Sequence, residues 1–369
     1  MKYKIGIIGL GGAGIVLLKE FHRREDCEVV GVLDTENVKD RYPLNDKLTF
    51  TTDETFFFSL GQQINVVTSP DSTHAYYVSK SLNNKIHVLC EKPLTDSLKG
   101  IEQIEKAIKD NPEIKIMVQH QMRNVPMFKD IKSLLNKNKL GKIGYIEGYY
   151  VHNLKNRAFV NHNWRNDDIA TPMVYSGIHF IDLLMWMLNE KPVEVYAMSN
   201  NILFPEYAES DCNVLLMKFK SGVIAKVITA FGVNRPQDHS IQIYGEEASI
   251  TNNIYFSNNT FKVFTGPIRN SLPERRFNYL KDSIILMYFH FFKFLMHFFP
   301  KNGQYSISNF PFRLYEHRYA VRQSVNDFIV SIKNNSNPAI PIHETVAAVK
   351  VALAGVQSYR TGKPIRLDW

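Results

Sequence analysis

KIGIIGLGGAG, residues 4–14, is the stretch of sequence that most directly indicates the fold. Its first five residues form an apolar run with the length of a short buried strand, and its last six have the spacing G-x-G-x-x-G. The amphipathic stretch that follows, up to Arg23, is predicted to be a helix. Glycines in such a turn let backbone N–H groups approach a pyrophosphate at the helix N-terminus. We therefore predict a nucleotide-binding turn made by Gly9, Gly11, Gly12, Ala13 and Gly14.

The pattern around this turn predicts two domains. Short apolar runs alternate with helix-length amphipathic stretches through the first third of the chain, which is typical of a parallel sheet covered on both faces. From about Lys142, strand-like runs follow one another with hairpin signals such as Lys220-Ser221-Gly222. We predict an α/β chain with an N-terminal Rossmann domain, a doubly wound parallel sheet, over 1–122. A C-terminal α+β domain with a mainly antiparallel sheet should cover 123–369.

Asp34 lies twenty residues after Gly14, at the end of the second strand-like run. A carboxylate at this position accepts hydrogen bonds from the adenosine ribose hydroxyls and repels a 2′-phosphate. The sequence therefore favours NAD over NADP as the cofactor.

A second group of motifs is more specific than the glycine turn. The run His87–Cys90 is followed by Glu91-Lys92-Pro93, and with the glycine turn this resembles the Gfo/Idh/MocA family of nicotinamide-dependent sugar and cyclitol oxidoreductases. The resemblance continues in Thr68-Ser69-Pro70 with His74, Gln121-Met122-Arg123, Trp164-Arg165, Gly177-Ile178-His179-Phe180-Ile181-Asp182 and the ending Ser358–Pro364. Glu-Lys-Pro and Gly-x-His-x-x-Asp in this order are the most specific of these signals.

The resemblance implies roles for these residues. Removing hydride from a carbinol carbon requires loss of the hydroxyl proton, so a lysine can hold that oxygen while a histidine takes or relays the proton. Lys92 and His179 match the family residues in these roles, and the Lys–Pro bond is often cis in the family. The implied cofactor contacts, besides the glycine turn and Asp34, are Thr68, Ser69, Pro70, His74, Glu91, Lys92 and Gln121. The implied substrate contacts are Lys92, Arg123, Trp164, Arg165, Tyr175, His179 and Asp182.

One position departs from the family pattern. Tyr175 stands four residues before His179, where many members carry an aspartate, and Ile169–Pro172 replaces a glycine cluster. The carboxylate that would orient the histidine is therefore missing. Tyr175 can donate or relay a proton, although an unperturbed phenol with a pKa near 10 is a poor base at neutral pH. We predict Lys92, His179 and Tyr175 as the catalytic residues, with the substrate and the direction of reaction left open.

The composition and charge of the chain indicate which metals and macromolecular partners to expect. The three cysteines form no C-x-x-C pair, so the chain has neither a disulfide framework nor a zinc site, and we expect no metal. No signal peptide is recognisable, which favours a cytoplasmic protein. The formal net charge is +8, yet no nucleic-acid-binding module is present and we expect no nucleic-acid partner. A homo-oligomer is expected.

An aromatic and basic insertion occupies about 269–322 and does not match the family core. At its centre, Ile284–Phe299 would form a helix of roughly 24 Å, which is too short to cross a bilayer. His290, Lys293, His297 and Lys301 form one polar stripe and leave a broad apolar face. Such a face with basic flanks is typical of a helix that lies in a membrane interface. Packing within the domain or against a subunit partner remains the alternative.

The sequence thus predicts an NAD-dependent oxidoreductase that transfers hydride between nicotinamide and a hydroxyl or ketone carbon of a sugar. The substrate would be a small-molecule sugar nucleotide or a glycan precursor used in polysaccharide biosynthesis, lipid-linked if the protein is peripheral to a membrane. An alternative is an NAD-dependent glycoside hydrolase that works by transient oxidation and elimination. A second alternative is a non-catalytic nucleotide-binding sensor, against which the presence of both Lys92 and His179 argues.

Overall fold

The computed structural model describes residues 2–36, 38, 48–154, 171–207, 209–234, 238–252, 254–257, 260–263 and 312–369. Its contacts divide the chain into two compact units. The first contains Met1–Gln121 and Val321–Leu353, and the second contains the described parts of Met122–Asn166, Thr171–Ala320 and Ala354–Trp369. The sequence placed all of 123–369 in the second domain, so the assignment of Val321–Leu353 differs from that expectation.

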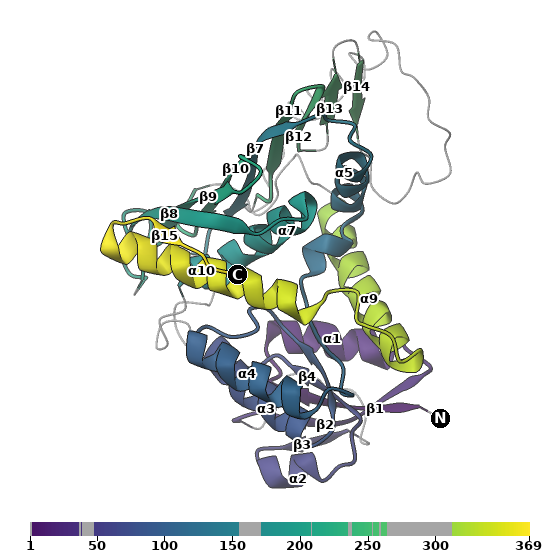
Figure 1. The fold of residues 1–369 in the computed structure, drawn as a ribbon. Coiled ribbons are helices and arrows are strands. Elements are labelled where there is room, and N and C mark those ends of the chain that lie inside the picture. Colours follow the sequence, from purple (N-terminus) through teal and green to yellow (C-terminus); the bar gives the residue numbers. More distant parts are fainter. Residues whose placement is uncertain are drawn as a thin grey trace, which may run out of the picture. The chain divides into compact units, whose positions relative to one another are not determined.

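The first unit is built on a six-stranded parallel sheet with the order β3-β2-β1-β4-β5-β6 (Figure 1). The strands are β1 (Tyr3–Ile8), β2 (Cys27–Leu33), β3 (Thr49–Thr51), β4 (Ile64–Val67), β5 (His87–Cys90) and β6 (Ile116–Val118). The helices that connect them are α1 (Gly12–His22), α2 (Glu54–Phe58), α3 (His74–Asn83) and α4 (Leu98–Asp110), with a 3₁₀ turn η2 (Asp71–Thr73). Strand order reverses between β1 and β4, and this is where ligands bind in doubly wound sheets. The predicted Rossmann fold is confirmed.

Alternation along the buried strands sends side chains to both faces of this sheet. Ile5, Ile7 and Val66 belong to a cluster that also contains Leu17, Leu18 and Phe21 of α1. The same cluster includes Val321, Val325, Phe328 and Ile329 of helix α9 (Phe312–Lys333). The apolar stripe of α9 therefore completes the core of the first unit, which explains why this segment belongs to the Rossmann unit.

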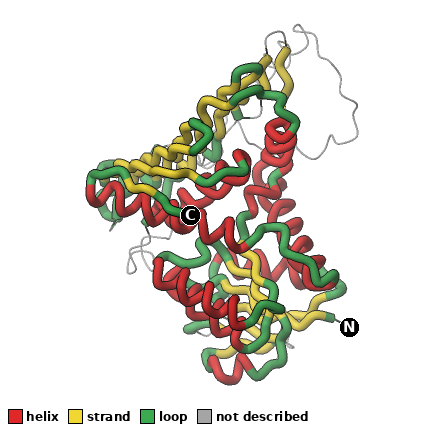
Figure 2. Tube along the Cα trace, in the orientation of Figure 1, coloured by secondary structure: helices red, strands yellow, loops and turns green. Residues whose placement is uncertain are grey.

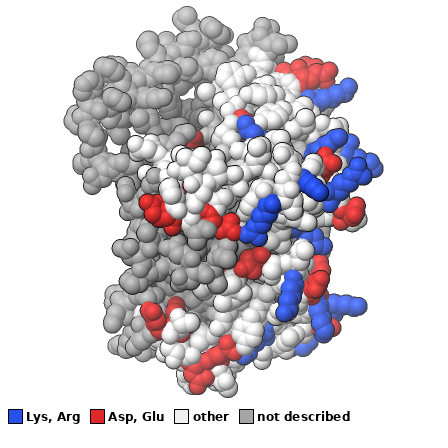
Figure 3. All heavy atoms as spheres, turned by 90° about the vertical axis from the view of Figure 1, so that its left-hand side faces the viewer, with Lys and Arg blue, Asp and Glu red and all other residues white. Residues whose placement is uncertain are grey.

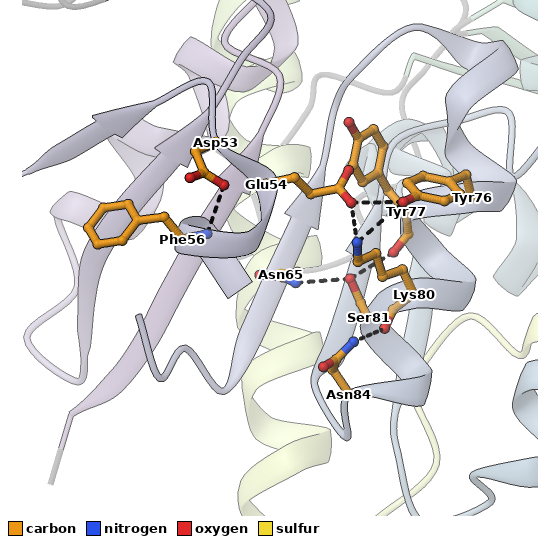
Figure 4. Close-up of polar contacts among 9 residues, drawn as sticks. All are labelled: Asp53, Glu54, Phe56, Asn65, Tyr76, Tyr77, Lys80, Ser81 and Asn84. Atoms are coloured by element: carbon orange, nitrogen blue, oxygen red, sulfur yellow. Dashed lines mark hydrogen bonds and ion pairs between the residues drawn. The ribbon is translucent and has the colours of Figure 1, made fainter. Parts of the chain in front are cut away.

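Polar contacts join α2 to α3 in the same unit (Figure 4). Glu54 forms an ion pair with Lys80 and accepts a hydrogen bond from the Tyr76 hydroxyl at 2.8 Å. The Asn65 side chain on β4 donates to Ser81 on α3 at 2.9 Å, so it satisfies a buried polar group within the core. These contacts fix α3, whose first residue is His74, against β4.

The second unit contains a nine-stranded sheet with the order β14-β13-β12-β11-β7-β10-β9-β8-β15, drawn as yellow strands in Figure 2. Its strands are β7 (Ile143–Val151), β8 (Pro192–Asn200), β9 (Cys212–Phe219), β10 (Ile224–Ala230), β11 (Ile241–Gly245), β12 (Ala248–Thr251), β13 (Ile254–Ser257), β14 (Thr260–Val263) and β15 (Ile365–Arg366). Only β7 and β10 pair in parallel; every other neighbouring pair is antiparallel. This confirms the predicted mainly antiparallel sheet.

Helix α7 (Ile178–Leu188) packs against this sheet at a glycine. A Cβ added to Gly148 on β7 would lie 2.0 Å from Cδ1 of Phe180, so only glycine allows this approach. Helix α5 (Pro126–Asn136) contacts the C-terminal end of α7, where Lys132 donates to the carbonyl of Trp186 at 2.7 Å. A cation at a helix C-terminus satisfies free carbonyls and matches the helix dipole. The position of α7 is thus fixed at both ends.

Helix α10 (Ile342–Thr361) contributes residues to both units.

Lys and Arg side chains are interspersed with Asp and Glu over the described part of one face (Figure 3). Among the described residues, no helix is both long and apolar enough to span a membrane. The predicted interfacial helix Ile284–Phe299 lies outside the described residues, as do Trp164 and Arg165.

Candidate cofactor and substrate sites

The glycine turn connects β1 to α1 in the first unit. Gly9 has a φ of +89°, and a Cβ at Gly14 would lie 2.2 Å from the Gly9 carbonyl oxygen. Helix α1 begins at Gly12 with Gly11 as its N-cap, and this glycine has no side chain to cap the first turn. Added Cβ atoms at Gly11 or Gly12 would meet no described atom within 4 Å. A helix N-terminus built from glycines, with no described atom crowding Gly11 or Gly12, fits the pyrophosphate of NAD.

Asp34 follows β2 and contacts the turn directly. Its Oδ2 accepts a hydrogen bond from the Leu10 N–H at 2.7 Å, and its Oδ1 accepts from the Thr35 N–H at 2.8 Å. The carboxylate therefore positions the glycine turn, and its predicted contact with the ribose remains a proposal.

The loop after β4 is held against the same turn. The Thr68 hydroxyl lies 2.5 Å from the Gly9 carbonyl oxygen. Ser69 and Thr73 share a hydrogen bond of 2.6 Å between their hydroxyls, and Thr73 also lies 2.7 Å from the Pro70 carbonyl. His74 is buried, and its two ring nitrogens lie near the carbonyl oxygens of Ser69 and Pro93.

Glu91, Lys92 and Pro93 follow β5. The Lys92–Pro93 bond is cis, which confirms the expectation from the family resemblance. Burial raises the pKa of the Glu91 carboxyl, while the charges of Lys92 and His74 act in the opposite direction. The Lys92 N–H lies 3.3 Å from Glu91 Oε2. Gln121 follows β6 and begins the 3₁₀ turn Gln121–Asn124, so the predicted cofactor residues of this unit all lie in loops or helix starts at the carboxyl ends of its strands.

In the second unit, Arg123 and Asp182 form a buried ion pair. Arg123 Nε donates to Asp182 Oδ2 at 2.8 Å and Nη2 donates to Oδ1 at 2.5 Å. The structure brings them together as partners of each other, and the predicted contact of both with substrate stays a prediction. Because Asp182 lies on α7, this pair fixes the helix that also carries His179.

His179 lies in an aromatic stack that the sequence did not indicate. The imidazole lies parallel to the Tyr150 ring, with 5.3 Å between centroids and an interplanar angle of 4°. Tyr150 also contacts His239, at a centroid distance of 4.4 Å. Tyr150 is on β7 and His239 precedes β11, so no local motif connects either residue to His179.

Tyr175 lies in a π-helical turn, Met173–Gly177, immediately before α7. Its ring is edge-on to Phe231 and packs against a cluster of Leu154, Phe204 and Tyr207. Single π-helical turns within helices are frequent at functional sites. The structure thus places Tyr175 one turn before His179 but with its ring among aromatic side chains.

The predicted residues are divided between the units. Lys92 belongs to the first unit, and Tyr175, His179, Arg123 and Asp182 belong to the second. Within the described ranges, no group of three or more His, Cys, Asp or Glu side chains could hold a metal ion.

Two family models together match most of the chain. Residues 3–120 match the model described as an oxidoreductase family with an NAD-binding Rossmann fold, and residues 132–367 match the model of the C-terminal alpha/beta domain of the same oxidoreductase family.

Individual proteins that are similar to this chain share 27% or less of its residues over the aligned region. Glucose-6-phosphate 3-dehydrogenase from Bacillus subtilis is 27% identical over 266 residues, covering 66% of this chain and 72% of the relative. The 2,7-anhydro-N-acetylneuraminate hydratase of Escherichia coli is 24% identical over 253 residues, covering 66% of each chain. The structure of scyllo-inositol dehydrogenase from Lactobacillus casei with bound NAD(H) and scyllo-inositol superposes with a TM-score of 0.75 at 18% identity, covering 99% of both chains. That last likeness shows a shared fold.

Proposed function

We propose, from the premise that this chain belongs to the Gfo/Idh/MocA family of oxidoreductases and has its NAD-binding Rossmann domain, that it oxidises or reduces a ring carbon of a sugar or cyclitol. The observation that carries this proposal is the glycine turn at the N-terminus of α1, linked through Asp34 and Thr68 to its neighbouring loops. When bound, NAD supplies the acceptor or donor for the hydride.

The chain's own residues would manage the proton and the oxygen. In the oxidising direction the carbinol carbon loses hydride and its hydroxyl loses a proton. We assign Lys92 to hold the oxygen and His179 to receive the proton, as the family resemblance implies. Tyr175 takes the position of the missing carboxylate. Its aromatic surroundings support an apolar contact with substrate more than a role in orienting His179.

The direct test is reduction of NAD in the presence of inositols, hexose phosphates and nucleotide sugars. Inositol and glucose-6-phosphate dehydrogenases among the relatives and neighbouring structures support the first two classes. Only the lipid-linked form of the proposed sugar nucleotide or glycan precursor rests on the aromatic and basic insertion. Turnover of nucleotide sugars only would favour a sugar nucleotide. Substrate-dependent NADH formation is expected with at least one class. Its absence with all of them would count against a dehydrogenase.

A second candidate is a reaction in which NAD is regenerated, such as NAD-dependent glycoside hydrolysis. The hydratase among the relatives and the replacement of the family aspartate by Tyr175 support it. Product release without accumulation of NADH would distinguish this reaction from a dehydrogenase. A sensor that only binds nucleotide would show neither product nor NADH.

The membrane contact proposed for Ile284–Phe299 rests on its apolar face and basic flanks. We expect wild-type protein to float with anionic liposomes and a variant with Phe291, Phe292 and Phe294 changed to serine to stay in solution. Flotation of wild type would direct the substrate search to lipid-linked sugars. Failure of wild type to float would contradict the membrane contact and leave soluble sugars as candidates.

A homo-oligomer is supported by one face of the nine-stranded sheet. Residues opposite one another on adjacent strands point to the same face. Ile224 is opposite Tyr145, which is opposite Tyr244, and Leu216 is opposite Lys226 in the next row. Leu216, Ile224 and Tyr244 are exposed large apolar side chains. A two-fold dimer would bury this patch against its copy, so Leu216→Glu should lower the mass measured by light scattering. An unchanged mass for the variant, or a monomeric wild type, would contradict this interface.

A further inference from the structure

His74, the first residue of α3, makes two contacts that a neutral imidazole cannot satisfy together. Its Nδ1 lies 2.6 Å from the carbonyl oxygen of Pro93, and its Nε2 lies 2.9 Å from the carbonyl oxygen of Ser69. Both partners are backbone carbonyls, which only accept hydrogen bonds. The side chain is 1% exposed, so water does not replace either contact.

A neutral imidazole has one N–H, and its other nitrogen has a lone pair. With two carbonyl partners, one nitrogen lone pair would face an oxygen lone pair at hydrogen-bond distance. The imidazolium has an N–H on each nitrogen and satisfies both carbonyls with charge-assisted hydrogen bonds. Since buried polar groups are almost always hydrogen-bonded, the geometry favours the doubly protonated ring.

A buried cation also needs a compensating charge. The titratable groups that interact with the Glu91 carboxyl are His74, Lys92 and Asp71 on η2, and the Cys90 thiol at the end of β5 interacts with both carboxyl groups. Asp71 is buried, and the Glu91 carboxyl interacts electrostatically with His74. The Glu91 carboxyl is therefore the group that can offset a positive charge on His74.

We propose that His74 is a doubly protonated positioning residue that ties the loop after β4 to the carbonyl of Pro93, the residue after Lys92. It acts on Lys92 through the Pro93 carbonyl and does not contact the cofactor through its ring nitrogens. The Ser69 contact extends the connection, because Thr68, the preceding residue, is hydrogen-bonded to the Gly9 carbonyl in the glycine turn. This inference rests on the proposed role of Lys92 in the reaction.

The first test is NMR of the full-length apoprotein labelled with ¹⁵N-histidine at neutral pH, with His74 assigned from the spectrum of His74→Asn. We expect both ring nitrogens of His74 to be protonated and protected from rapid exchange. A neutral tautomer, with one protonated and one unprotonated nitrogen, would overturn the proposal. This result does not depend on the enzyme's substrate.

The second test separates positioning from cofactor contact. In His74→Asn we expect kcat to fall about 10- to 100-fold, because small misplacement of a reacting group costs this much, while the Kd for NADH stays within about threefold of wild type. His22→Asn, an exposed histidine on α1, is the matched control and should leave both unchanged. An unchanged kcat with weakened NADH binding would contradict a positioning role. If Lys92→Ala keeps full activity, the proposed function fails, whatever the NMR result.

Discussion

Arg123 and Asp182 face each other as a buried two-point ion pair, with 2.8 Å from Nε to Oδ2 and 2.5 Å from Nη2 to Oδ1. Their side chains are only 6% and 1% exposed. Arg123 precedes α5 and Asp182 is on α7, one turn after His179, so the pair connects two helical segments of the second unit. We conclude that it supports the helix that presents His179, since both carboxylate oxygens accept hydrogen bonds from Arg123.

Asp182→Asn should lower the free energy of unfolding by about 3–5 kcal/mol, because the buried Arg123 charge loses its counter-charge. The measurement is urea denaturation at neutral pH. The matched control is Asp110→Asn in the exposed Lys106–Asp110 pair, which should cause no measurable change. Equal stability of Asp182→Asn and wild type would show that the pair does not hold α7.

Gly148→Ala should destabilise the second unit by about 1–3 kcal/mol through overpacking against Phe180. Gly144→Ala on the same strand is the control, since its added Cβ would be 3.9 Å from the nearest described atom outside its chain neighbours. Adding Phe180→Leu to Gly148→Ala should restore part of the loss, measured by thermal unfolding. A Gly148→Ala variant as stable as Gly144→Ala would contradict the close packing of α7 on β7.

Asp26 links β2 to α9 in the Rossmann unit. Hydrogen bonds from Arg24 hold its pKa well below the usual value of 3.8, burial opposes this effect, and Lys333 adds to it. A lowered folded-state pKa means that the stabilisation is present above about pH 4 and is lost as the pH falls through the lowered value.

Asp26→Asn should therefore cost about 1–2 kcal/mol at pH 7, and the difference from wild type should shrink as the pH falls from about 4 towards 2. Chemical denaturation across this range is the measurement. A difference that is the same at pH 3 and pH 7 would show that the cost comes from something other than the charge of Asp26.

Tyr150 is expected to orient His179 through ring stacking. Tyr150→Leu should lower kcat about tenfold, whereas Tyr150→Phe, which keeps the ring, should lose less than threefold. Tyr244→Leu removes a tyrosine that stacks on Tyr145 in the same sheet and serves as the control. The measurement is kcat from steady-state kinetics with the substrate found among the inositols, hexose phosphates and nucleotide sugars. Equal losses of kcat in Tyr150→Leu and Tyr150→Phe would indicate a role of the hydroxyl and contradict stacking.

How much the sequence predicted depends on the range of the contacts. The Rossmann sheet follows from buried strands that alternate with helices, and the glycine turn is a local feature, so both were predicted correctly. The sequence did not predict that α9 belongs to the Rossmann unit. The apolar spacing of Val321, Val325 and Phe328 predicts a buried helix face, but it does not say which core covers that face.

The site shows the same limit. The cis Lys92–Pro93 bond was expected from a contiguous motif and is present. The Tyr150–His179 stack and the Arg123–Asp182 pair join residues 29 and 59 positions apart, and no spacing rule connects them. The pairing of His74 with two carbonyl groups depends on the backbone path after β4 and β5, which residue types alone do not reveal.

We propose that Lys92 serves the chemical step and that the NAD site forms without it, and one pair of variants separates these two roles. Lys92→Ala and the exposed control Lys99→Ala should be compared for NADH binding by fluorescence titration and for turnover with the substrate identified from the panel. We predict that Lys92→Ala loses at least about 100-fold in kcat while it binds NADH about as tightly as Lys99→Ala. Full turnover in Lys92→Ala would show that Lys92 does not serve the chemical step.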